Sequence, residues 1–264
     1  MQARSALFDL YGDHLRRRGG QAPVAALIRL LAPLGVAAPA VRTAISRMVR
    51  QGWLIPARTA GGAGYRLTGR AALRLEEAGA RIYRTETQAW DGNFDLLVVT
   101  NPTTRPEREK LAANLTFLGY GRLDGCVWIA ARAAGEVDSM LNDAGVRFER
   151  LSAAHTGGAA GARVMVGRAW DLQAIGSAYT AFIERMTPVM RSVDRHADDE
   201  TAFAARSRLV HEWRAFLFTD PQLPSSLLPD PWPGHAAAAY FDRHADRLRP
   251  AADRFVDECL AEKE

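Results

Sequence analysis

The segment from Ala38 to Gly52 constrains the fold most, because its apolar and charged residues separate onto two faces of one short helix. Pro39 suits the first turn of a helix, where its missing N–H costs nothing, and Gly52 suits the left-handed residue that ends one. The apolar residues recur at helical spacing and share one face: Val41, Ile45, Met48 and Val49. The opposite face carries three arginines and no acid: Arg42, Thr43, Ser46, Arg47 and Arg50. Such side chains reach phosphates and base edges, so the segment predicts a nucleic-acid-binding helix; a solvated basic surface helix is the alternative.

Two further helices are predicted upstream of this segment. The first helix is predicted over residues 3–18, where leucines recur on one face. It ends in three arginines at 16–18, which suit either a helix C-terminus or a phosphate contact. Residues 24–34 form the second helix, and a turn at Gly35 leads from it into the basic helix. Two helices joined by a short turn with glycine match the dimensions of a helix-turn-helix.

A glycine-rich hairpin is predicted directly after the basic helix. Residues 53–58 have the composition of a strand, residues 61–64 that of a flexible turn, and residues 65–67 that of a return strand. Arg58 and Arg66 are expected beside the tip of this hairpin. A basic helix followed by such a hairpin is the order of a winged helix-turn-helix.

Positive charge is concentrated in the same part of the chain. Residues 1–84 contain 14 Lys/Arg against 4 Asp/Glu, a balance of +10, while the remaining residues contain 20 against 26, a balance of −6. This asymmetry predicts a polyanion partner for the N-terminal module only. With 264 residues, 48% hydrophobic and 24% charged, the chain has the composition of an ordinary soluble globular protein of two or three domains.

The central part, residues 90–168, predicts a small α+β domain. Strands are expected over 94–100, 121–131, 146–151 and 163–166, with helices over 106–118 and 136–144. This succession corresponds to the βαββαβ order of a ferredoxin-like domain. The glycine-rich stretch at 157–161 is expected to be a mobile connection between the last two strands.

The last part, residues 170–264, predicts a mainly α-helical domain. Helices are expected over 172–186, 201–218, 235–248 and 251–262, and Pro188 is expected to bend or end the first of them. Five prolines between 220 and 234 predict a stiff extended loop. The fold class is therefore α+β multidomain: a winged helix-turn-helix over 1–84, a ferredoxin-like domain over 90–168 and a helical domain over 170–264.

Patterns typical of enzymes and metal sites are missing from the sequence. His211-Glu-Trp-Arg begins like the zinc motif H-E-x-x-H, but Ala215 occupies the position of the second ligand. The two cysteines, Cys126 and Cys259, lack the spacing of a zinc site or a disulfide frame. We therefore expect no catalytic residues, no metal and no cofactor. No targeting or membrane-spanning segment is apparent, so a cytoplasmic location is expected.

An ordered set of motifs resembles one known family over nearly the whole chain. The set comprises Arg-Gly-Gly at 18–20, Ala-Val-Arg-Thr-Ala-Ile-Ser-Arg-Met-Val at 40–49, Gly-Trp-Leu at 52–54, Trp-Asp-Gly at 90–92, Trp-Asp-Leu at 170–172 and Asp-Pro-x-Leu-Pro at 220–224. In these motifs the chain resembles the PaaX-type regulators, the phenylacetic-acid degradation repressor family. The resemblance implies a homodimeric repressor of catabolic genes that is released by an aryl-acyl-CoA thioester such as phenylacetyl-CoA.

Two sets of site residues are predicted. For double-stranded DNA carrying an inverted repeat, four residues are expected to enter the major groove and three to hold phosphates: Arg42, Thr43, Ser46 and Arg47, then Arg50, Arg58 and Arg66. For the acyl-CoA effector, His211 and Arg214 are expected to bind polar groups, with Trp213 and Trp232 beside the acyl group. The alternative for the first two is a structural pair that ties the proline-rich loop to its helix.

The sequence leaves three other classes of function open. Enzyme signatures are missing, but an enzyme that acts on an acyl-CoA and carries a winged-helix module is the main alternative. A nuclease or RNA-binding role for the ferredoxin-like domain is less favoured, because residues 85–168 lack the basic surplus of the first module. The third is an adaptor whose winged helix binds a protein.

Overall fold

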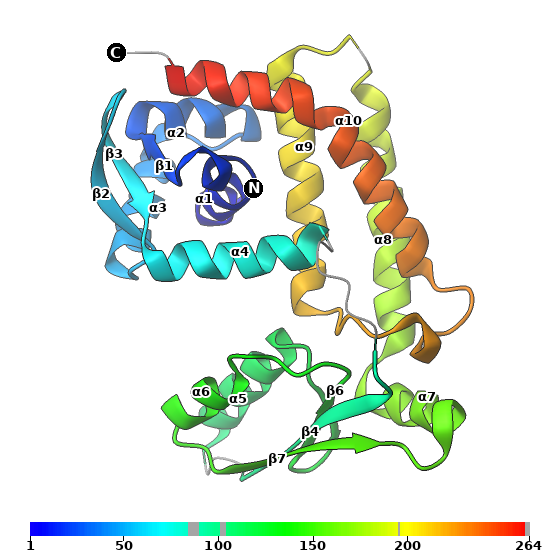
Figure 1. Cartoon of the computed structure of the whole chain (residues 1–264). Coiled ribbons are helices and arrows are strands. Elements are labelled where there is room, and N and C mark those ends of the chain that lie inside the picture. The colour runs from blue at the N-terminus through cyan, green and yellow to red at the C-terminus, as the bar shows by residue number, and fades with distance from the viewer. Residues whose placement is uncertain (84–89, 101–103, 195, 262–264) are drawn as a thin grey trace. The chain divides into compact units, whose positions relative to one another are not determined.

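The computed structural model describes residues 1–83, 90–100, 104–194 and 196–261 (Figure 1). It is mixed α+β and mostly helical, with two small sheets. By their contacts the residues form two compact units, the first containing Met1–Glu86, Phe182–Arg214 and Ala237–Glu264, and the second Thr87–Ala181 and Ala215–Ala236. The predicted division into three consecutive segments stays a prediction, and its first boundary, at 84–90, includes residues outside those described.

Three helical segments open the first unit, as predicted. Helix α1 (Ala3–Leu10) continues through a π-helical turn, η1 (Tyr11–Leu15), and a 3-10 turn, η2 (Arg16–Arg18), and ends at Gly19, whose φ is 84°. Helix α2 (Val24–Leu31) and its 3-10 extension η3 (Ala32–Leu34) are followed by α3 (Ala38–Arg50). The chain bends by 120° between the second and third segments, an angle found in helix-turn-helix pairs.

A three-stranded antiparallel sheet follows α3. Strands β2 (Leu54–Thr59) and β3 (Gly62–Leu67) form a hairpin, and the short β1 (Gln21–Pro23) pairs with the other edge of β3. The prediction of a flexible turn over 61–64 is wrong, because only Ala60 and Gly61 form the turn and residues 62–64 pair within β3. Glycine at 64 has a packing role there, since a Cβ atom would overlap the carbonyl oxygen of Ala22.

Alanine at Gly64 should therefore destabilise the protein. The added Cβ would force β1 and β3 apart, and overpacking of this kind costs about 1–3 kcal/mol. Urea denaturation followed by circular dichroism measures the change. Gly69→Ala is the matched control, since its Cβ would meet open space, and it should be neutral or slightly stabilising. Equal midpoints for the two variants would contradict the packing role of Gly64.

Helix α4 (Gly69–Tyr83) leads out of the hairpin and begins after its cap residue, Thr68. The Thr68 hydroxyl accepts a hydrogen bond from the amide of Ala71 at 3.2 Å and donates one to the carbonyl of Gly52 at 2.8 Å. The cap residue therefore also fastens the end of α3 to the start of α4.

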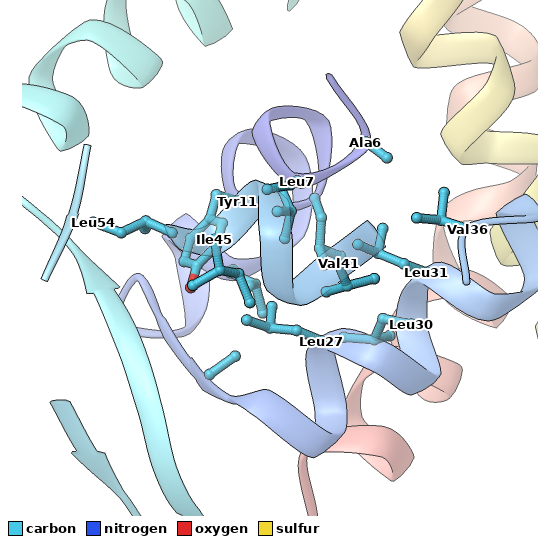
Figure 2. Packing of buried hydrophobic residues seen from close by; sticks show 14 of the residues in the cluster. Ala6, Leu7, Tyr11, Leu27, Leu30, Leu31, Val36, Val41, Ile45 and Leu54 are labelled. Atoms are coloured by element: carbon cyan, nitrogen blue, oxygen red, sulfur yellow. The ribbon is translucent and has the colours of Figure 1, made fainter. Parts of the chain in front are cut away.

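The hydrophobic core of the first unit is shared between the two ends of the chain. Leu7, Leu27, Val41, Ile45 and Leu54 pack together between the N-terminal helices and the hairpin (Figure 2). The same cluster contains residues from α9 (Asp199–Arg214) and α10 (Pro233–Ala261): Phe203, Ala252, Val256 and Cys259. The support of α3 therefore includes the last helices of the chain.

The second unit contains the predicted βαββαβ order. Its elements are β4 (Asn93–Val99), α5 (Arg105–Phe117), β5 (Gly121–Asp124), β6 (Val127–Ala130), α6 (Val137–Asp143) and β7 (Phe148–Ala154). They form one antiparallel sheet in the order β5-β6-β4-β7. The order is confirmed, but the assignment differs, since the strand predicted over 121–131 is a hairpin of two strands.

Residues 158–169 correct two predictions for this unit. They form α7 (Gly158–Ala169), so the strand predicted over 163–166 and the mobile connection predicted over 157–161 are both wrong. Ala162 and Val166, one helical turn apart, are buried against Phe94 and Leu227, which requires helical spacing. Glycine at 161 makes room for the His155 ring, because a Cβ atom would overlap that ring.

Prolines interrupt the C-terminal helices less than predicted. Helix α8 (Leu172–Ser192) begins at Asp171, whose carboxylate accepts the amide of Ala174 at 2.9 Å, and it does not end at Pro188. The two helices predicted over 235–248 and 251–262 are a single helix, α10, in which Pro250 is internal; Glu262 lies outside the described residues. Buried residues of α10 before and after Pro250, among them Leu248 and Ala252, hold the helix together by packing.

The predicted helix over 201–218 is α9 followed by a 3-10 turn, η4 (Ala215–Phe218). The proline-rich loop after it is irregular, as predicted, except for a 3-10 turn, η5 (Ser225–Leu227). Leu223, Leu227 and Trp232 anchor the loop in buried positions. Among the described residues, no single helix is both long and apolar enough to cross a membrane.

Candidate nucleic-acid interface

Helix α3 presents its basic face to solvent and its apolar face to the core. Val41, Ile45 and Met48 are at most 2% exposed. The five polar residues predicted to contact DNA are all exposed: Arg42, Thr43, Ser46, Arg47 and Arg50. Arg42, Arg47 and Arg50 make no ion pair with any residue that the structure describes. The face is therefore free to receive phosphates and base edges.

The two arginines of the hairpin lie on opposite faces of it. Arg58 pairs with Ala63, one position from the tip, whereas Arg66 pairs with Ile55 and Gln21 toward the base. Side chains alternate along a strand, so Arg58 shares a face with the core residue Leu54 and Arg66 points to the other side. Both arginines are exposed, but the expectation that Arg66 lies beside the tip is wrong.

Two of the three arginines at 16–18, unlike those of α3, make ion pairs within the unit. Arg16 pairs with Glu76 on α4 at 3.4 Å, and Arg18 pairs with Asp257 and Asp253 on α10 at 2.6 and 3.1 Å. Two of the three arginines thus fasten the end of the first helical segment to the rest of the unit.

His211 and Arg214, predicted to contact an effector, both contact Asp9 on α1. The Nδ1 atom of His211 lies 2.7 Å from one carboxylate oxygen, and a terminal nitrogen of Arg214 lies 2.9 Å from the other. Asp9 is 7% exposed, so Arg214 offsets the charge of a buried carboxylate and His211 supplies it with a hydrogen-bonding partner. Their partner is α1, not the proline-rich loop that the structural alternative named.

The two tryptophans predicted to border the effector lie in different units. Trp213 is buried in the first unit, where its indole N–H donates to the carbonyl of Ile82 at 3.2 Å and its ring stacks on Phe241. Trp232 is buried in the second unit, edge-on to Tyr179. The effector role of these residues stays a prediction.

A buried polar network, which sequence reasoning missed, joins the N-terminal helical segment to α9 and α4. A terminal nitrogen of Arg206 lies 2.9 Å from a carboxylate oxygen of Asp13 and donates to the Tyr83 hydroxyl, also at 2.9 Å. Tyr83 in turn donates to Asp13. Burial opposes the ionisation of Asp13, but His14 and Arg206 outweigh it and hold the pKa of this carboxyl below its ordinary value.

Asp253 should make the stability of this unit depend on acid pH. Hydrogen bonds from His14 and then Arg18 outweigh burial and lower the pKa of Asp253 from 3.8 to about 2. A depressed pKa stabilises the folded state above the unfolded pKa, and this contribution is lost as pH falls through the folded pKa. We expect the urea midpoint to fall between about pH 5 and 2, and to fall less in Asp253→Asn. Equal slopes in the two proteins would contradict this role.

Known proteins resemble this chain over nearly its whole length. Residues 2–71 match the family model of PaaX-like proteins, residues 87–165 that of the PaaX protein central Cas2-like domain, and residues 170–258 that of the PaaX-like protein C-terminal domain. Transcriptional repressor PaaX from Escherichia coli (strain K12) is 32% identical over 263 residues, which cover 96% of this chain and 83% of the relative. The chain belongs to the PaaX-like protein family.

One solved structure adds to this assignment. The uncharacterized protein Rv0674 from Mycobacterium tuberculosis is 27% identical to this PaaX-like chain and superposes with a TM-score of 0.60. The match covers 96% of this chain and 98% of the other. The likeness therefore extends over nearly all of the chain.

The motif residues outside the first module hold loops in this PaaX-like chain. Trp90 donates its indole N–H to the carbonyl of Asn93 at 2.7 Å. The Trp170 ring lies against the backbone at Gly121, where a Cβ atom would overlap it. Asp220 accepts the hydroxyl of Tyr179 and the amide of Gln222. These motif residues therefore have local structural roles, in turns and close contacts.

The acidic residue at the centre of the Cas2-like sheet, Asp95, is paired with an arginine and a tyrosine hydroxyl. Asp95 on β4 accepts hydrogen bonds from Arg150 on β7, the closer at 2.9 Å, and from the hydroxyl of Tyr120. Burial, then the hydrogen bond to Asp95, raises the pKa of Tyr120 far above its ordinary value. Arg150 also binds Asp138 on α6 at 2.8 Å, so this cluster fastens a helix to the sheet.

Proposed function

We propose that this chain is a homodimeric, DNA-binding transcriptional repressor of aromatic, phenylacetate-type catabolic genes, acting in the cytoplasm. The observation that carries the proposal is the division of α3 into two faces. One face is exposed, basic and free of acidic residues, and the opposite face is apolar and buried. Its place after α2, with a bend of 120°, and before a hairpin supports a winged helix-turn-helix. The name of the Escherichia coli relative supports the direction of regulation.

In this proposal α3 enters the major groove of an inverted-repeat operator. Arg42, Thr43, Ser46 and Arg47 are the residues expected to read bases, and Arg50 to hold a phosphate. Arg58 and Arg66 lie on opposite faces of the hairpin, so we expect them to contact different phosphates. Two subunits present two such helices, and their spacing must match the spacing of the half-sites.

Release by an aryl-acyl-CoA thioester, such as phenylacetyl-CoA, is the proposed control. Because α9 and α10 share the core that supports α3, a ligand that moves these helices also moves the DNA-binding face. Inverting a two-state population from 99:1 to 1:99 requires about 5.5 kcal/mol of differential affinity. A ligand as large as a CoA thioester has enough contacts to supply this difference.

A gel shift with the DNA upstream of the protein's own gene, repeated against a panel of acyl-CoA thioesters, tests the proposal. We expect a specific complex that weakens steeply with salt and dissociates with an aryl-acyl-CoA. Hydrolysis or transfer of the thioester by the purified protein, without operator binding, would favour the enzyme alternative instead.

An effector role for Arg214 predicts a smaller thermal shift with phenylacetyl-CoA in Arg214→Ala than in the wild type. The variant without ligand should itself melt at a lower temperature, because Asp9 loses its arginine neighbour. Differential scanning fluorimetry with and without ligand separates the two effects. An unchanged ligand-induced shift would leave Arg214 with its structural contact to Asp9 alone.

A further inference from the structure

A charged hollow of about 320 Å³ lies inside the first unit, where η1 and η2 meet α9 and α10. Four arginines line it: Arg17, Arg18, Arg206 and Arg249. Its acidic residues are Asp13, Asp253 and Asp257, with His14 beside them. We infer that this hollow binds the phosphate group of a small anionic ligand, and that binding loosens α10 from the first helical segment.

The floor of the hollow is fixed. Arg206 is 2% exposed, and its terminal nitrogens bind Asp13, the Tyr83 hydroxyl and the carbonyl of Ala245. Releasing either member of a buried ion pair leaves an uncompensated charge, which is strongly unfavourable. Arg206 and Asp13 therefore shape the site without exchanging partners.

Two guanidinium groups at the rim are available to a ligand. Arg17 is exposed and makes no ion pair within the part of the chain that the structure describes. Arg249 contacts Asp246 at 2.9 Å and lies over the Tyr83 ring. The carboxylate of Asp246 is 72% exposed, so this pair contributes little and is readily replaced.

Arg18 is the third group, and it is held by competitors that a phosphate would displace. It binds Asp257 at 2.6 Å and Asp253 at 3.1 Å, and these side chains are 64% and 39% exposed. The Asp257 carboxylate regains most of its water when released, so giving up this contact costs little, and Asp253 keeps its contact with His14. Guanidinium groups form the same planar, bidentate pairs with phosphate as with carboxylate, so a phosphate can take the place of a carboxylate partner.

The exchange has a mechanical consequence, because Arg18 ends the first helical segment while Asp253 and Asp257 lie on α10. The same segment packs on α3 through Leu7 and Tyr11. Weakening its attachment to α10 therefore reaches the DNA-binding face. This consequence rests on the proposed function, whereas binding of the phosphate does not.

The size of the hollow limits which part of a ligand it holds. Pockets for whole small molecules span roughly 300–1,000 Å³, and this one is at the lower end. It therefore takes a phosphate group and the atoms next to it, while the remainder of the ligand lies outside. A phosphate of coenzyme A and a phosphate of the DNA backbone share this chemistry.

Isothermal titration of the full-length protein with coenzyme A at fixed ionic strength tests the site. We expect the double variant Arg17→Ala/Arg249→Ala to bind at least tenfold more weakly than the wild type. Arg191→Ala, an exposed arginine of the same unit outside the hollow, should bind as the wild type does. Binding by the double variant within twofold of the wild type, or no binding by the wild type, overturns the inference.

A variant that is expected to raise the affinity for coenzyme A distinguishes ligand binding from a merely structural effect. Asp257→Asn removes a competitor for Arg18, so we expect it to bind coenzyme A severalfold more tightly. Glu258→Gln removes the same charge from the same exposed turn of α10 outside the hollow and should change the affinity little. Weaker binding by Asp257→Asn would overturn the exchange mechanism.

Measuring operator binding by Arg249→Ala in the absence of coenzyme A distinguishes a phosphate of a small ligand from a phosphate of the DNA backbone. An affinity within twofold of the wild type supports the small ligand. A loss of DNA affinity with unchanged coenzyme A binding assigns the hollow to the DNA backbone and overturns the inference. If coenzyme A binding depends on these arginines but the protein binds no operator, the site is supported and the proposed function is refuted.

Discussion

Replacing Arg42 and Arg47 together by alanine should lower the affinity for operator DNA by a factor of roughly 30 to 20,000. Each arginine that reads a base contributes about 1–3 kcal/mol, and the two side chains lie on the exposed face of one helix. Their loss removes no buried contact, so the fold should be unchanged. Fluorescence anisotropy with the operator and with unrelated DNA measures both affinity and specificity.

The salt dependence distinguishes base contacts from phosphate contacts in the same experiment. Arg50→Ala should weaken binding evenly on all sequences and reduce the slope of log K against log salt by about 1. Arg191→Ala, far from α3 in sequence and also exposed, serves as the charge control. Operator binding at wild-type strength by Arg42→Ala/Arg47→Ala would refute the assignment of α3 as the recognition helix.

The second large effect concerns stability. Arg206→Met should lower the free energy of unfolding by about 3–5 kcal/mol, because it leaves the buried carboxylate of Asp13 without its arginine. The double variant Asp13→Asn/Arg206→Met should recover part of this loss, since no unpaired charge remains. Urea denaturation of the single and double variants measures the coupling.

An exposed ion pair provides the contrast. Arg105 and Glu109 are one helical turn apart on α5, 2.7 Å from each other, with both side chains largely in water. Arg105→Met should leave the midpoint nearly unchanged. If Arg206→Met were equally mild, the network around Asp13 would not hold the N-terminal segment to α9.

Local sequence patterns predicted the elements whose partners lie close along the chain. The faces of α3, its proline start and its glycine end follow from helical periodicity and backbone preference, and the structure confirms them. Thr68 and Asp171 cap the helices that follow them in the same local way, since a cap needs only a side chain three residues before an amide.

Where a segment's state depends on distant contacts, the sequence predicted it less well. Residues 163–166 have the β-branched composition of a strand, yet packing against Phe94 and Leu227 makes them helical. Pro250 signals a helix end, but buried neighbours on both sides carry α10 through it. Position 64 requires glycine because β1, more than 40 positions earlier, pairs with β3 there and leaves no room for a Cβ atom.

The sequence by itself determined that a basic, acid-free helix face exists, because charge and periodicity are properties of a short segment. Only the tertiary structure decided which arginines remain free to bind a ligand. Arg18 meets Asp257 across 239 positions, and Asp9 meets His211 across 202. No spacing rule links such residues, since their contact depends on helices from both ends of the chain packing into one core.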